Sequence, residues 1–175
     1  MIMGISVATF TQLHVLISLT GIATGIVVVS AMLKGHYARI WTATFLFTTI
    51  ATSVTGFMFR SKFGPPHAIG VISLVVLAVA VTALYGLKLR GRWRRVYVVS
   101  AALALYLNIF VAVVQTFQKV EFFHALAPTQ AEPPFAIAQG LLLVAFIALG
   151  VLAARRFHPT FDGRLSGQVT HRGST

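Results

Sequence analysis

The chain has 175 residues, of which 57% are hydrophobic and 10% charged, with a formal net charge of +11 and no cysteine. Its mean hydropathy of +0.86 is far above that of a soluble domain. These values favour a membrane protein, and the lack of cysteine excludes disulfides, thiolate metal sites and thiol catalysis.

Five long apolar stretches contain no Asp, Glu, Lys or Arg. A helix needs about 20 apolar residues to cross the hydrocarbon layer, and none of the stretches alternates as a barrel strand does. We therefore predict an all-α fold, a polytopic transmembrane bundle of five helices within one domain of residues 1–154. The helices are expected at about residues 8–33, 40–59, 67–87, 96–118 and 135–154.

Residues 155–175 form a basic segment rich in Gly, Ser and Thr without an apolar period, which predicts a disordered tail. Most of the 14 Lys and Arg residues fall in the first and third predicted loops and in this tail. An excess of basic residues marks the cytoplasmic side of a bacterial inner membrane, so we predict an external N-terminus and a cytoplasmic C-terminus.

The same clustering of charge argues against nucleic acid as a partner and in favour of membrane lipids. Five helices alone rarely enclose a transport pathway, so a homo-oligomer or a larger membrane complex is a further expected assembly.

Residues 33–41 align without a gap to residues 89–97, sharing Leu, a basic residue, Gly, an aromatic residue and Arg in the same order. His14 and His67 also occupy similar places in the first helix of each copy. Two duplicated helical hairpins would explain this pattern. Convergence of tight basic loops would explain it equally well.

A short interfacial helix is expected within residues 120–128, in the long loop before the last helix, because Phe122, Phe123 and Leu126 share one side. This loop is either a lid over a pocket or a docking surface for a partner.

Polar side chains gather in the external half of the predicted bundle. Asn108 and Gln115 lie two helical turns apart and therefore share a face. Carboxamides are costly in lipid unless they pair inside the bundle or line a wet cavity. The predicted ligand-binding pocket contains His14, Thr52, Thr55, His67, Asn108, Gln115 and Gln139. The alternative is an interhelical hydrogen-bond network that binds no ligand.

Histidine offers the only candidates for a cofactor. His14 and His67 would have to face each other to hold a haem b, and together with His124 they are weak candidates for a metal site. Glu121 and His124 have the spacing of a di-iron motif, but with three acidic residues the chain has too few ligands for that centre.

Several segments resemble a family of small bacterial multi-pass inner-membrane proteins of unknown function. They are Thr-Gly-Phe at 55–57, Pro-His with Ile-Gly at 66–70, residues 106–111 with Gln115, residues 127–130 and residues 132–135. The resemblance implies no activity.

The chain has no phosphate-binding loop, no nucleophile elbow and no pair of intramembrane carboxylates, so no catalytic residue is assigned. We expect a non-catalytic accessory or ligand-binding membrane subunit whose outward polar pocket takes a quinone, a haem or a small solute. The alternative is a small oligomeric transporter.

Overall fold

The computed structural model describes residues 6–59 and 65–159, and these residues are helical with short connections and no strand. This confirms the all-α class. The elements are α1 (Val7–Leu33), α2 (Arg39–Gly56), α3 (Pro65–Val81), the π-helical turn η1 (Thr82–Gly86), α4 (Trp93–Lys119), α5 (Glu121–Leu126) and α6 (Pro133–Arg156).

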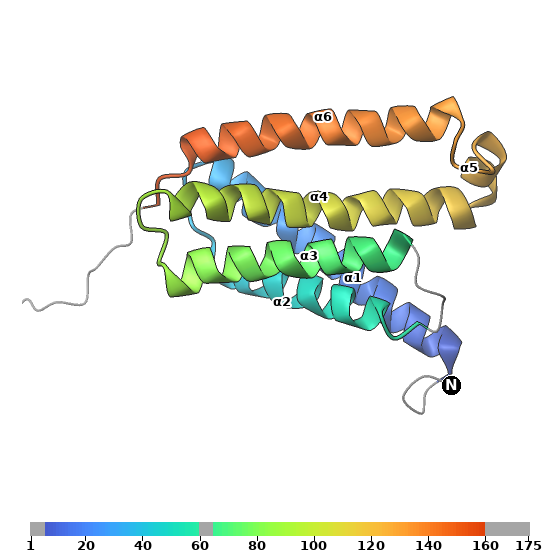
Figure 1. Ribbon diagram of the computed structural model, residues 1–175, viewed down its shortest axis with the longest axis horizontal. Helices are drawn as coiled ribbons and strands as arrows, with labels where there is room; N and C mark the ends of the chain where they lie inside the picture. Colours follow the sequence, from blue (N-terminus) through green and yellow to red (C-terminus); the bar gives the residue numbers. More distant parts are fainter. Residues whose placement is uncertain (1–5, 60–64, 160–175) are drawn as a thin grey trace, which may run out of the picture.

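Four of the helices form a bundle in which α1 and α3 each contact both α2 and α4 (Figure 1). The fifth long helix, α6, lies outside this bundle along α4 and also contacts α1. One end of the molecule, which we call the α5 end, carries α5 and the start of α1. The other end, which we call the basic end, carries the α1–α2 and α3–α4 connections and the end of α6.

Four helical segments are long and apolar enough to cross a membrane: Val7–Leu33, His67–Gly86, Trp93–Lys119 and Pro133–Arg156. Helix α2 is not among them, so the predicted count of five spanning helices is confirmed only in part. Its 18 residues begin with Arg39 and are rich in threonine, which lowers the hydropathy.

Four of the six threonines of α2 bond to their own helix. The hydroxyl groups of Thr44, Thr48, Thr52 and Thr55 each donate to a backbone carbonyl four residues earlier, at distances of 2.7 to 3.1 Å. Such internal bonds remove much of the cost of carrying hydroxyl groups in an apolar environment.

Helix boundaries differ from the sequence prediction in several places. Helix α2 ends at Gly56 rather than at residue 59, and the third helix closes with the π-helical turn η1. Helix α6 begins at Pro133 because proline is accepted in the first turn, where no backbone donor is needed. It continues to Arg156, so the predicted tail begins inside the helix, and residues 160–175 of that tail lie outside the described residues.

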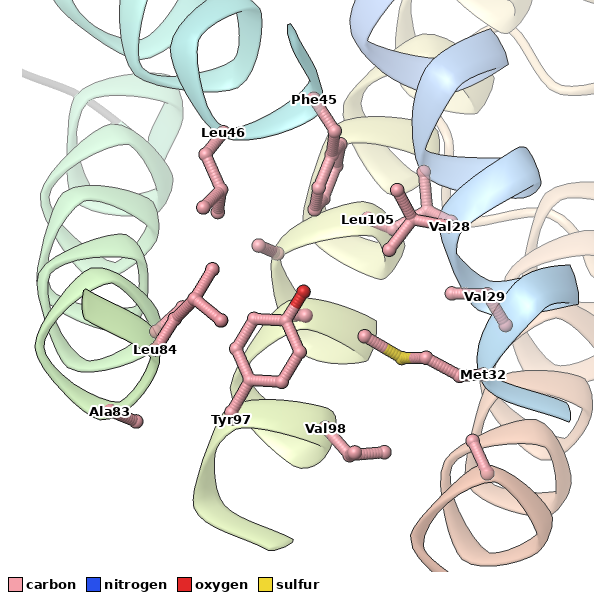
Figure 2. Packing of buried hydrophobic residues seen from close by; sticks show 14 of the residues in the cluster. Val28, Val29, Met32, Phe45, Leu46, Ala83, Leu84, Tyr97, Val98 and Leu105 are labelled. Atoms are coloured by element: carbon pink, nitrogen blue, oxygen red, sulfur yellow. The ribbon is translucent and has the colours of Figure 1, made fainter. Parts of the chain in front are cut away.

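The largest apolar core lies in the half of the bundle nearer the basic end, where Phe45, Leu105, Met32 and Tyr97 are almost fully buried (Figure 2). Gly25 permits this packing, because a Cβ atom there would lie 2.6 Å from Leu105 Cδ1 and 2.8 Å from the Phe45 ring. Close helix packing of this kind depends on small residues.

Candidate functional site

A cavity of about 670 Å³ lies between α1, α2, α3 and α4 in the half of the molecule nearer the α5 end. It reaches that end of the bundle, where Val7, Lys119 and Val120 belong to its lining. Its volume falls within the range of pockets that hold small organic ligands.

Each helix presents one face to this space. From α1, Thr11, His14 and Ser18 line the cavity at helical spacing, and from α4, Asn108 and Gln115 do so with the apolar residues between them. The sequence-based argument that Asn108 and Gln115 share a face therefore agrees with their placement.

Five of the predicted pocket residues line this cavity: His14, Thr52, His67, Asn108 and Gln115. Two do not. Gln139 belongs to α6, outside the four-helix bundle, and its Nε2 donates to the backbone oxygen of Phe110 at 3.2 Å. Thr55 lies beside the α2 face formed by Thr49, Thr52, Ser53 and Gly56, so it reaches the site only through His14.

At the inner part of the cavity, Asn108 is buried and joins α4 to α1. Its Oδ1 accepts a hydrogen bond of 2.9 Å from the Ser18 hydroxyl, whereas its Nδ2 is buried without a hydrogen-bond partner among the described residues. The Thr49 hydroxyl is likewise buried without a hydrogen-bond partner among the described residues. A Cβ atom at Gly21 would lie 3.1 Å from Asn108 Nδ2 and 3.2 Å from Thr49 Oγ1, so these two polar atoms approach the same glycine.

Nearer the α5 end, the wall combines histidine with aromatic rings. His14 Nδ1 lies 2.8 Å from Thr55 Oγ1, and the His14 ring packs edge-on against Phe59 with centroids 5.2 Å apart. The His67 ring lies 5.8 Å from that of Phe57. Both histidines are therefore held by neighbouring groups at the cavity wall.

Gln115, Thr116 and Lys119 complete the polar lining on α4. Gln115 Oε1 is buried without a hydrogen-bond partner in the described part of the chain. Lys119 is the one charged side chain among the described residues that line the cavity. The site is thus a mainly apolar space with scattered neutral donors and acceptors.

The three histidines proposed as weak metal ligands are not brought together. His124 lies on α5, is exposed and does not line the cavity. Within residues 6–59 and 65–159, no group of three His, Asp or Glu side chains is placed to hold a metal ion. His14 and His67 both line the cavity, and the haem that they would have to face stays a prediction.

Sequence reasoning missed Ser18, Thr49 and Ser73, which also line the cavity. Ser18 follows His14 by one helical turn, and this spacing was the signal that could have found it. Thr49 precedes Thr52 by three residues and had the same signal. Ser73 had no such signal, because hydroxyl residues are common contacts between membrane helices.

No known protein family, curated protein or solved structure matches the chain. The resemblance drawn from the sequence therefore stays a prediction.

Proposed function

We propose that the protein is a ligand-binding subunit of the bacterial inner membrane, with five transmembrane helices and a cavity open to the external side. The favoured ligand is a neutral molecule with an apolar body and a hydrogen-bonding head, of which a quinone is the best example. This proposal includes α2 as the fifth spanning helix, because it packs within the bundle and four of its threonine hydroxyls donate to carbonyls of the same helix.

One observation carries the proposal: Asn108 and Gln115 each leave a buried amide atom without a hydrogen-bond partner and both line the same 670 Å³ cavity. A buried polar group without a partner costs roughly 1 to 3 kcal/mol. A ligand head group would supply the missing partners once these two amides turn toward the cavity, because both atoms are buried. A carbonyl oxygen suits the Asn108 N–H, and a hydroxyl suits the Gln115 oxygen.

The lining also favours a neutral ligand. No acidic residue occurs among the described residues that line the cavity, and Lys119 lies at the α5 end of α4. Most of the remaining lining is apolar, including Leu19, Ile69 and Leu107. A quinone ring with the start of its isoprenoid chain matches this combination better than an ion does.

A small oligomeric transporter is less favoured by the packing. The apolar core occupies the half of the bundle nearer the basic end, and none of its members lines the cavity. A solute passing through one copy would have to separate Phe45, Leu105 and Tyr97, which are all almost fully buried.

The first experiment is the ultraviolet and visible absorption spectrum of the protein purified in mild detergent, before and after extraction with organic solvent. Quinone in the extract supports the proposal. A Soret band would instead assign the cavity to haem held by His14 and His67, and the quinone would be rejected.

The second experiment measures thermal unfolding with an added short-chain ubiquinone analogue. The expected result is stabilisation of the native protein and loss of that stabilisation in the N108L/Q115L variant. Gln139→Leu is the matched control, because it makes the same kind of change at an amide outside the cavity. Equal effects of the two variants would mean that the amides act through stability and that the cavity does not bind the analogue.

A further inference from the structure

A second hollow lies at the basic end, between the beginning of α4 and the end of α6. These two antiparallel helices meet there in Figure 1. The hollow measures about 530 Å³. Its lining consists of Arg94, Arg95, Val99, Gly150, Val151, Ala154, Arg155 and His158. This groove, which we call the α4–α6 groove, shares no residue with the cavity described above.

Within residues 6–59 and 65–159, the basic side chains of this groove have no acidic side chain as a counter-charge. No salt bridge involves Arg94, Arg95 or Arg155 among the described residues. Glu121 and Glu132 flank the opposite ends of α4 and α6, roughly 35 Å away at 1.5 Å per residue. The His158 ring faces the backbone locally, since its Nδ1 donates to the Arg156 carbonyl oxygen at 3.3 Å. The lining of this hollow thus contains three arginines and no acidic side chain.

The lining of the groove changes from basic to apolar with distance from the basic end, on both α4 and α6. Arg95 is followed one turn deeper by Val99 on α4, and Arg155 is preceded one turn deeper by Val151 on α6. Both valines are exposed, at 53% and 46%. Cations therefore lie at the end of the helices, and apolar surface lies below them on both walls.

Small residues keep the space between the helices open. Gly150 and Ala154 form the α6 side of the groove, and a Cβ atom at Gly150 would meet only Ala102 Cβ, at 4.0 Å. Below the arginines, the lining consists of Val99, Gly150, Val151 and Ala154 and is therefore apolar, as a hydrocarbon chain requires.

We propose that the α4–α6 groove binds one anionic phospholipid, with its phosphate against Arg94, Arg95 and Arg155 and an acyl chain along Val99 and Val151. Arginine is suited to phosphate because its planar fork can donate two hydrogen bonds at once. Basic pockets between membrane helices bind anionic head groups on the cytoplasmic side. The inference rests on the proposed membrane placement of α4 and α6 and is independent of the ligand in the other cavity.

The test is native mass spectrometry of the purified full chain, loaded from mixed micelles that contain phosphatidylglycerol and phosphatidylcholine. We expect one phosphatidylglycerol to be retained in preference to phosphatidylcholine. Each basic side chain near an anionic surface strengthens binding roughly fivefold, so R94Q/R95Q/R155Q should weaken retention by roughly a hundredfold.

The matched control is K88Q/R90Q/R92Q, which removes three charges from the same end of the molecule but outside the groove. It should reduce retention far less. Equal losses in the two triple variants would show general attraction to the basic end and overturn the site. Absence of retained phosphatidylglycerol in the unchanged protein would overturn it as well.

Two further measurements separate a lipid from a soluble phosphate. Val151→Trp fills the apolar part of the groove and keeps all the charges, so it should abolish retention of the lipid. Glycerol 3-phosphate should fail to displace phosphatidylglycerol at equal concentration. A tryptophan variant that still retains the lipid, or displacement by glycerol 3-phosphate, would assign the groove to a free phosphate and overturn the proposal. The Val151→Trp test also stands if the triple variant does not fold.

Discussion

Ser18 of α1 donates a hydrogen bond of 2.9 Å to Oδ1 of Asn108 in α4, which joins two helices across 90 residues of sequence. Both side chains line the larger cavity. The bond therefore fixes the orientation of the Asn108 amide and leaves its Nδ2 as the buried amide atom without a hydrogen-bond partner among the described residues.

We expect Ser18→Ala to lower the free energy of unfolding by about 1 kcal/mol, because it leaves a second atom of the Asn108 amide without a partner. Asn108→Leu alone should remove the amide altogether. In the Asn108→Leu background, Ser18→Ala should then lower the free energy of unfolding by less than it does in the unchanged chain. The double-mutant cycle is measured by thermal or denaturant unfolding in detergent. Strictly additive effects would mean that the two side chains do not interact.

How far the sequence predicts this site can be judged from Asn108 and Gln139. Hydropathy, charge distribution and helical spacing place both amides at similar depth, and the helical register of α4 correctly puts Asn108 and Gln115 on one face. Depth does not reveal which helices form the bundle. Gln139 does not line the cavity because α6 packs outside the other four helices, and this depends on contacts between segments far apart in the sequence.

The predicted repeat shows a similar limit. Gly35 and Gly91 are aligned by the sequence, and both have a positive φ, of 78° and 53°. Yet α1 continues to Leu33, whereas the matching Leu89 lies after the end of η1 and itself has a φ of 55°. Glycine in a left-handed turn is required by tight connections in general. Duplication of the hairpins therefore stays a prediction.

Gly25 offers a test of the close packing between α1, α2 and α4. Gly25→Ala places a methyl group within 2.6 Å of Leu105 Cδ1 and 2.8 Å of the Phe45 ring. We expect a loss of roughly 1 to 3 kcal/mol in the free energy of unfolding, because overpacking forces neighbouring side chains to move. Gly140→Ala on α6 is the control, since a Cβ atom there meets no atom within 4 Å. It should be neutral or slightly stabilising, given the higher helix propensity of alanine. Similar destabilisation at both positions would contradict the close approach at Gly25.

Glu132 gives the loop before α6 a dependence on pH. Desolvation alone would raise the pKa of its carboxyl, but hydrogen bonds from the Thr129 hydroxyl and from the backbone N–H groups of Thr129 and Ala131 outweigh it and lower the pKa. A carboxyl whose pKa is lower in the folded chain stabilises the fold above its unfolded pKa. This contribution is lost as the pH falls through the lower, folded value.

We therefore expect hydrogen exchange at the Thr129 and Ala131 amides, corrected for the intrinsic rate at each pH, to accelerate as the pH falls through the acidic range. Glu132→Gln should remove this pH dependence, because a neutral amide does not titrate there. If the variant keeps the same pH profile as the unchanged chain, another group controls the loop.

The orientation of the molecule is tested by reporter fusions. The basic end carries Lys34, Arg39 and the arginines of the α3–α4 connection, and α6 ends there with Arg155 and Arg156. Positive residues are retained on the cytoplasmic side, so we expect a fusion after Arg156 to report a cytoplasmic location. A fusion within residues 129–131, which precede α6 at the α5 end, should report an external location.

A single fusion after residue 36 tests α2 separately. If α2 crosses the membrane, this fusion is cytoplasmic, like the fusion after Arg156. An external report there, together with a cytoplasmic report after Arg156, would require an odd number of crossings between these two positions. With α3, α4 and α6 all crossing, this result would reject α2 as a spanning helix. If both fusions report an external location, the protein has the opposite orientation in the membrane. The larger cavity would then open to the cytoplasm and draw its ligand from that side.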